Sequence, residues 1–192
     1  LLLAPIIGLV VGMAAQRLLG RVLRIARPGL NTWLRRAQWP TCALLAFSHG
    51  SNDAQKSMGV ITAVLVITGH QKTFSVPLWV VLACGTAITI GAASGGWRIV
   101  RTLGFRVFRV RPLHALETQV LAGTIVDTAA KLGAPVSTSH VVSSTLIGVG
   151  AAARPRAVHW EVGSEMLFTW LITIPSAALV AAAAWLGLTG VA

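Results

Sequence analysis

Apolar residues in this chain gather into long stretches, and short polar segments separate them. Three of these stretches cover about residues 1–19, 76–96 and 163–188, and a fourth covers about 40–69. An apolar helix of about 18 residues or more is long enough to cross the ~30 Å hydrocarbon core of a bilayer. The pattern therefore predicts an all-α polytopic membrane protein with about four transmembrane helices.

The stretch from about 40 to 69 differs from the others because its centre, Ser48 to Ser57, is polar. As a single helix it would measure roughly 45 Å, which is more than a straight crossing needs. Gly50 and Ser51 are poor residues for a helix interior. We therefore expect a helix that is either broken at these two residues or strongly tilted.

This polar centre is the first candidate site. A helix that restarts after a break presents free N–H groups in its first turn, and these suit an anion. Asn52 and Asp53 add hard oxygen ligands for sodium or a proton, and in a helix Asp53 would pair with Lys56 at i,i+3. The alternative is that these side chains pair with one another only for packing. So many polar and small residues in one membrane span favour a function.

Two shorter apolar arms, about 113–132 and 135–153, are joined by a Gly-Ala turn. Charged residues in these arms, such as Glu117 and Asp127, are costly to expose to lipid. Non-helical backbone at membrane depth is tolerated only where it is buried in protein or lines a wet cavity. We therefore favour a re-entrant hairpin packed among the other spans over two full crossings.

The turn of this hairpin, in the sequence GAPVSTSH, is the second candidate site. Proline is favoured in the first turn of a helix, so we expect Pro135 to open the second arm. Ser137 and Thr138 would then lie beside free N–H groups at the positive end of the helix dipole, an arrangement that suits a tetrahedral oxyanion. The alternative is ordinary capping of a helix by serine and threonine.

The arms hold further ionisable residues with different expected roles. Asp127 and Lys131 are spaced i,i+4, and we expect them to neutralise each other. Glu117 has no obvious helical partner and is a candidate ligand for a cation or a proton. His49 and His140 are expected to be hydrogen-bonding partners rather than proton carriers.

The charges predict an orientation. The formal net charge is +11, but all arginines fall into three polar stretches, 17–36, 98–111 and 154–156. Basic residues between spans mark the cytoplasmic side, and one arrangement places all three stretches there and the C-terminus outside. This distribution argues against nucleic acid as a partner. No motif of an enzyme or of a metal site is present, so we predict neither catalysis nor a bound metal.

Two segments resemble a known family. SHGSNDAQKSMGVI, from Ser48 to Ile61, and GAPVSTSHVVSSTLIGVG, from Gly133 to Gly150, are similar to motifs of the PiT family of inorganic phosphate transporters. The similarity continues through Gly96-Trp97-Arg98 and through the arm that carries Glu117. On these motifs the chain is identified as a member of the family.

The resemblance implies secondary active symport of inorganic phosphate across the cytoplasmic membrane, coupled to protons or sodium, with no other cofactor. By the family pattern, the residues that bind phosphate would be Ser137, Thr138, Ser139 and Gln55. The residues that bind the coupling ion would be Asn52, Asp53 and Glu117. Sulfate transport within the same family is an alternative, because sulfate is also a tetrahedral oxyanion. A second alternative is a membrane assembly subunit that does not transport.

Such transporters resemble inverted repeats, in which each half supplies one segment with an Asn-Asp pair and one hairpin. This sequence has one of each, so it resembles a C-terminal half, a single transmembrane domain over residues 1–192. We expect Leu1 to lie partway into a longer protein whose N-terminal half completes the site. The expected partners are thus that half, phosphate, the coupling cation and the lipid bilayer, and a homodimer stays open.

Overall fold

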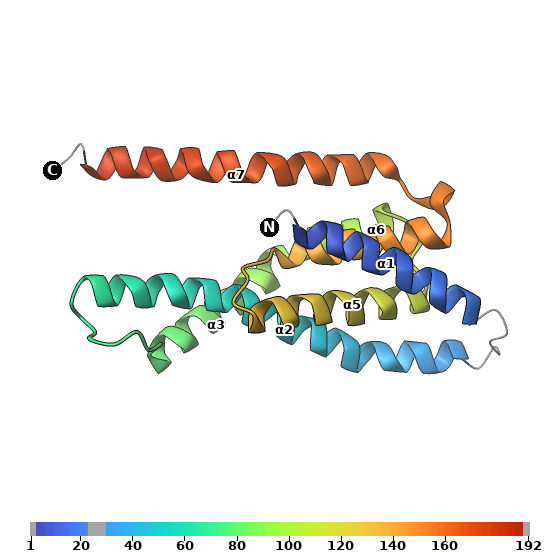
Figure 1. Ribbon diagram of the computed structural model, residues 1–192, viewed down its shortest axis with the longest axis horizontal. Coiled ribbons are helices and arrows are strands. Elements are labelled where there is room, and N and C mark those ends of the chain that lie inside the picture. The colour runs from blue at the N-terminus through green and yellow to red at the C-terminus, as the bar shows by residue number, and fades with distance from the viewer. Residues whose placement is uncertain (1–2, 23–29, 190–192) are drawn as a thin grey trace. The chain divides into compact units, whose positions relative to one another are not determined.

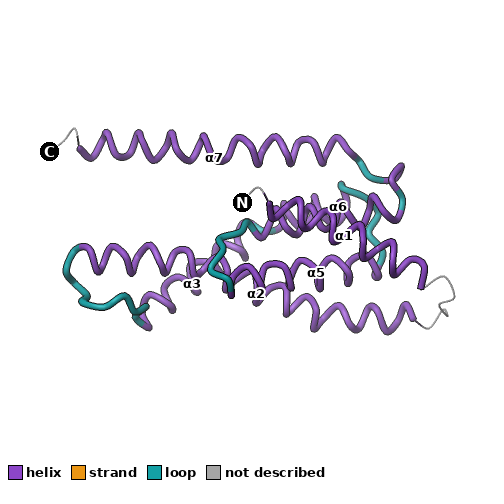
Figure 2. Tube along the Cα trace, in the orientation of Figure 1, coloured by secondary structure: helices purple, strands orange, loops and turns teal. Residues whose placement is uncertain are grey.

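The computed structural model describes residues 3–22 and 30–189, and the secondary structure within these ranges is helical (Figure 2). Leu1 and Leu2 of the first predicted span lie outside the described residues, as do Arg24 and Arg27 of the first arginine stretch. The described ranges contain seven α-helices: α1 (Leu3–Val22), α2 (Leu30–Ile67), α3 (Leu78–Gly95), α4 (Trp97–Arg101), α5 (Pro112–Lys131), α6 (Thr138–Ala153) and α7 (Trp160–Thr189). The prediction of an all-α fold is confirmed.

Three of these helices are long and apolar enough to cross a membrane, over Leu3–Arg21, Leu78–Gly95 and Trp160–Thr189. They coincide with three of the predicted spans. Large apolar side chains on them, such as Leu82 and Leu171, are exposed. An apolar surface of this extent suits contact with lipid or with further protein rather than with water.

The chain forms two compact units, Leu1–Val158 and His159–Ala192. The second unit consists mainly of α7, a helix of 30 residues that continues through Pro175. Among the described residues of α7, only Gly163 is buried. The candidate sites therefore lie in the first unit.

In that first unit, α2 is one continuous helix of 38 residues, so the expected break at Gly50 and Ser51 is wrong (Figure 1). Apart from its own stretch of helix, no described part of the chain lies within 4 Å of the place where a Cβ would stand at Gly50. The Ser48 hydroxyl donates to the backbone oxygen of Leu44, one turn earlier. An interior glycine costs only about 1 kcal/mol, less than the loss of the helical hydrogen bonds at a break. This segment therefore offers an anion no helix N-terminus.

The first arm of the hairpin, α5, lies beside α2 and runs in the same direction (Figure 1). The amide nitrogen of Gln38 donates to the backbone oxygen of Pro112 at 3.1 Å, and the Thr41 hydroxyl donates to Gln119 at 2.6 Å. Farther along, Gly123 packs against the backbone of α2 at Leu45. Residue numbers at the contacts therefore increase along both helices in the same direction, so α2 and α5 are parallel.

The turn of the hairpin meets α2 near Lys56, whose ammonium donates to the backbone oxygen of Val136. From Lys56, α2 continues to Ile67, about 17 Å farther at 1.5 Å per residue. The hairpin therefore turns back well before the far end of α2.

The second arm, α6, packs closely against α1 through glycines. A Cβ added at Gly8 would lie 2.5 Å from the Ser144 hydroxyl, and one added at Gly12 would lie 2.5 Å from the backbone oxygen of Thr145. Small residues four apart allow two helix backbones to approach in this way. The Gly8–Gly12 pair is thus a packing motif, with α6 as its partner.

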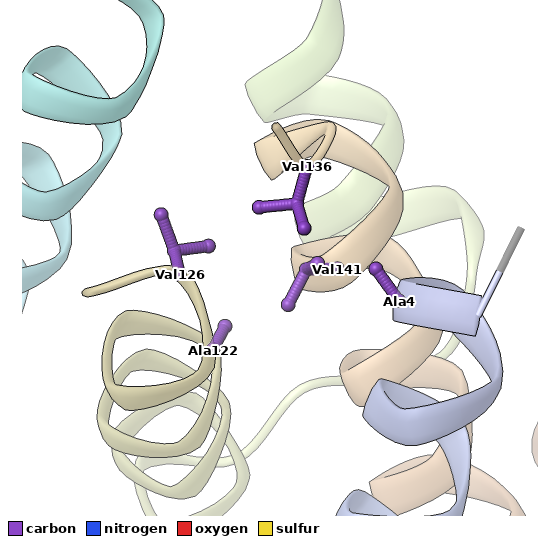
Figure 3. Packing of buried hydrophobic residues seen from close by; sticks show 5 residues of the cluster. All are labelled: Ala4, Ala122, Val126, Val136 and Val141. Atoms are coloured by element: carbon purple, nitrogen blue, oxygen red, sulfur yellow. The ribbon is translucent and has the colours of Figure 1, made fainter. Parts of the chain in front are cut away.

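A small apolar core ties the hairpin to α1 (Figure 3). The residues of this cluster come from α1, from α5, from the turn and from α6: Ala4, Ala122, Val126, Val136 and Val141. Val136 is the turn residue in the cluster, and its side chain is 8% exposed. Its side chain is therefore held in the core while its backbone oxygen faces α2.

Candidate functional site

The two predicted polar segments meet at Asn52. Its amide nitrogen lies 3.0 Å from the backbone oxygen of Val136 and 3.1 Å from the Thr138 hydroxyl. Both side chains are buried, with 3% exposure for Asn52 and 2% for Thr138. A buried amide that is paired in this way fixes the position of its partners, because leaving it unpaired would be costly. Asn52 therefore holds the hairpin turn against the middle of α2.

A charged cluster adjoins this contact on the same helix. The Lys56 ammonium lies 3.0 Å from Asp53 Oδ1 and also donates to the backbone oxygen of Val136. The other carboxylate oxygen of Asp53 lies 3.3 Å from His49 Nε2. The predicted pairing of Asp53 with Lys56 is confirmed. Asp53 is thus surrounded by donors from one turn before it and one turn after it.

Helix α6 begins at Thr138, with Ser137 as its N-cap, so the expectation that Pro135 opens the helix is wrong by three residues. The side chains of Asn52 and Lys56 donate to the backbone oxygen of Val136, which precedes the helix. The N-cap residue Ser137 is extended, with a φ of −87° and a ψ of 112°. Gly133 makes the preceding turn with a φ of 68°, a conformation that glycine adopts without strain. The hydroxyls of residues 137 to 139 still stand at the start of α6, where N–H groups lack intrahelical partners.

Two predicted phosphate ligands are not part of the Asn52–Thr138 contact. Gln55 and Ser139 are both exposed in this chain. Ser137 is half-buried at the N-cap and makes no side-chain capping hydrogen bond. The structure therefore brings Thr138 to Asn52 and leaves the side chains of Gln55 and Ser139 accessible.

Glu117 lies apart from the charged cluster. It is on α5, two residues before Gln119, whose side chain contacts Thr41 of α2. Along α2, Thr41 lies about 18 Å from Asp53. The Glu117 side chain is 5% exposed, and within the described part of the chain neither carboxylate oxygen has a hydrogen-bond partner.

The ion pair predicted within the hairpin, between Asp127 and Lys131, is confirmed. Lys131 Nζ lies 2.7 Å from Asp127 Oδ2, near the end of α5. Sequence reasoning did not foresee the backbone oxygen of Val136 as an acceptor for two side chains. No sequence pattern marks a single carbonyl, although Val136 stands before the N-cap of α6 and so lies outside the helix.

The fold and the site are those of a helical membrane protein, in which two polar segments meet at the start of a short helix. The chain belongs to the phosphate transporter family, whose family model matches residues 24–181. This is a family of transporters and not of enzymes, which confirms the prediction that the chain is not an enzyme.

Individual relatives agree with this assignment. The chain is 37% identical over 187 residues to a probable low-affinity inorganic phosphate transporter of Bacillus subtilis, covering 96% of this chain and 56% of the relative. It is 39% identical over 154 residues to a protein of the same description from Rhizobium meliloti, covering 80% and 46%. The chain thus spans about half the length of the curated relatives it matches.

A solved structure is similar as well. It is described as the sodium-dependent phosphate transporter, and it matches with a TM-score of 0.67 and 29% sequence identity. The match covers 76% of this chain and 37% of the solved chain. The arrangement of helices described above is therefore one that a phosphate transporter also adopts.

Proposed function

We propose that the protein to which this chain belongs carries inorganic phosphate across the cytoplasmic membrane by symport with protons or sodium. Membership of the phosphate transporter family supports the substrate. The observation that carries the proposal is the contact of Asn52 with Thr138, which joins two polar segments 86 residues apart inside a membrane protein. Polar side chains are costly to bury in a membrane protein, and those that are buried commonly mark the path of a solute or an ion.

Phosphate binds, in this proposal, at the start of α6. Hydroxyl donors come from Ser137, Thr138 and Ser139, and the first turn of the helix adds free N–H groups. The positive end of the helix dipole favours the negative charge of the ligand. Gln55 is exposed one turn along α2 from Asn52, where its amide is accessible to the same ligand.

The coupling ion binds, in this proposal, at Asn52 and Asp53. Their oxygen atoms are hard ligands of the kind that sodium or a proton requires. A cation at Asp53 offsets part of the negative charge of phosphate and lowers the cost of moving it through a medium of low dielectric constant. Glu117 supplies a second, separate coupling group, because a buried carboxylate without a partner favours a proton or a cation.

The chain forms, in this proposal, the C-terminal repeat of an inverted-repeat transporter. Four helices cross the bilayer and α5 and α6 form a re-entrant hairpin, an assignment supported by the turn that stops well before the end of α2. Residues near the ends of four helices, namely Gly20, Asn31, Pro112 and Arg154, line one cavity, so the three arginine stretches share one end of the first unit. By the positive-inside rule this end is cytoplasmic, and the C-terminus lies outside.

Uptake by the full-length protein in proteoliposomes tests this proposal. Accumulation of radioactive phosphate inside the vesicles is measured under a proton gradient and under a sodium gradient. Each measurement is repeated with unlabelled phosphate or unlabelled sulfate as competitor. We expect accumulation that one of the two gradients drives and that excess phosphate suppresses. Full competition by sulfate with poor competition by phosphate would assign the protein to sulfate instead. No accumulation under either gradient, with the protein correctly inserted, would favour an assembly subunit.

A further inference from the structure

Two adjoining cavities lie at the arginine end of the first unit, far from the hairpin turn. Their volumes are about 380 Å³ and about 540 Å³. Arg111, His114 and Arg154 line both of them. Cavities of this size accept small ligands. Helix α6, with 16 residues and a length of about 24 Å, separates them from Thr138, so they are distinct from the proposed transport site.

The charge on these cavity walls is positive and unbalanced. Arg109 also lines the smaller cavity, and among the described residues no carboxylate lines either one. Over the described ranges, the ion pairs within 4 Å involve neither Arg111 nor Arg154. Glu117 lies one turn deeper on α5, but both of its oxygens are buried and do not reach the cavity surface. The arginine side chains can therefore direct their planar donors to a ligand.

The first turn of α5 adds donors to the same place. Arg111 is the N-cap residue and its side chain makes no capping hydrogen bond, since a guanidinium carries donors only. The backbone N–H groups beside Leu113, which lines the larger cavity, therefore have no acceptor within the helix. An anion in the cavity would cap this turn.

Two buried polar side chains distinguish these cavities from an ordinary basic surface. Gln16 is 7% exposed and lines the larger cavity, and its Oε1 has no hydrogen-bond partner among the residues that the structure describes. His114 is 9% exposed, and its Nδ1 accepts from the Arg111 backbone N–H at 3.3 Å, which leaves Nε2 as the donor. Polar groups held at fixed positions on its wall orient a ligand in such a cavity.

We propose that these cavities bind a phosphate group, at a site separate from the transport path. Two sources carry this chemistry at a membrane surface. One is the headgroup of an anionic phospholipid such as phosphatidylglycerol, because basic pockets between membrane helices recognise such headgroups. The other is free inorganic phosphate, which carries P–OH groups at neutral pH. The site does not depend on the proposed transport function.

The test compares two double variants of the full-length protein. Arg111→Gln with Arg154→Gln removes two charges from the cavities. Arg36→Gln with Arg156→Gln removes two charges from exposed arginines that line neither cavity. Native mass spectrometry after reconstitution in phosphatidylcholine, with or without phosphatidylglycerol, counts retained anionic lipid. Calorimetric titration with inorganic phosphate, in phosphatidylcholine alone, gives the number of phosphate ions that each protein molecule binds.

We expect the cavity variant to bind either phosphatidylglycerol or inorganic phosphate more weakly, by about tenfold or more, because each lost arginine removes charge-assisted hydrogen bonds. The control variant should bind both as the wild type does. Loss of retained phosphatidylglycerol alone identifies the lipid headgroup. Loss of one phosphate-binding event identifies free phosphate. Equal effects in both variants, or no effect in either arm, overturn the proposal. Phosphate uptake is measured beside these assays, so that failure of transport and failure of this site are distinguishable.

Discussion

The amide nitrogen of Asn52 lies 3.1 Å from the hydroxyl of Thr138, and this contact joins the middle of α2 to the first residue of α6. Helix capping does not explain this contact, because Asn52 is in the interior of a continuous helix. The contact sets the position of the α6 N-terminus, where we place phosphate. Changes at either residue should therefore alter binding before they alter the fold.

Thr138→Val should weaken phosphate binding. The substitution keeps the shape of the side chain but removes a hydroxyl donor and leaves the Asn52 amide short of one acceptor. We expect a loss of about 1–3 kcal/mol in affinity, measured by phosphate titration of the full-length protein. Thr145→Val is the matched control, because Thr145 is equally buried on the same helix and its hydroxyl has no partner in the described part of the chain. An unchanged affinity in Thr138→Val would exclude Thr138 as a ligand.

Asp53→Asn should abolish coupled uptake. The amide removes the negative charge that Lys56 and His49 surround, so a coupling cation loses its counter-charge. Uptake driven by a proton or sodium gradient should fall to background, while the amount of protein in the membrane stays the same. Asp127→Asn is the control, since its side chain is 37% exposed against 36% for Asp53 and is also paired with a lysine. Gradient-driven uptake at the wild-type rate in Asp53→Asn contradicts the coupling role.

Ion pairs between residues of the same helix were predicted correctly from their spacing in the sequence. Asp53 with Lys56 and Asp127 with Lys131 follow from spacing alone, because residues three or four apart share a helix face. The same local reasoning failed at Gly50, where low helix propensity indicated a break. Packing of α2 against α5 on the side of Leu45 outweighs a cost of about 1 kcal/mol.

Contacts between distant segments could not be predicted from the residues alone. Hydrophobic periodicity does not specify which helix a polar side chain meets, so neither the Asn52–Thr138 contact nor the partner of Gly12 was predicted from spacing. The start of α6 was misplaced for a related reason. The backbone oxygen of Val136 is bound by side chains of α2, and such a constraint leaves no mark in the turn sequence.

Gly12→Ala should destabilise the protein. A Cβ at Gly12 would lie 2.5 Å from the backbone oxygen of Thr145, and a backbone cannot move away as a flexible side chain can. We expect a loss of about 1–3 kcal/mol of unfolding free energy, seen as a lower midpoint of thermal unfolding in detergent. Gly59→Ala is the control, because no described atom outside its own stretch of helix lies within 4 Å of its Cβ position and alanine favours the helix. If both variants unfold at the wild-type temperature, α1 does not pack on α6 through this glycine.

Lys56→Met should make phosphate uptake depend on added sodium. Methionine keeps the length of the side chain but removes the ammonium that lies 3.0 Å from Asp53 and also binds the backbone oxygen of Val136. These two oxygens then lack a cation, and they are the kind of hard ligands that sodium accepts. Without sodium, uptake should fall by about tenfold or more, since hydrogen bonds to charged groups are strong, and it should recover as sodium is raised. Lys131→Met, which breaks the other lysine–aspartate pair, should show neither effect. Uptake in Lys56→Met that equals the wild type at every sodium concentration would show that the ammonium does not act as the resident cation of Asp53.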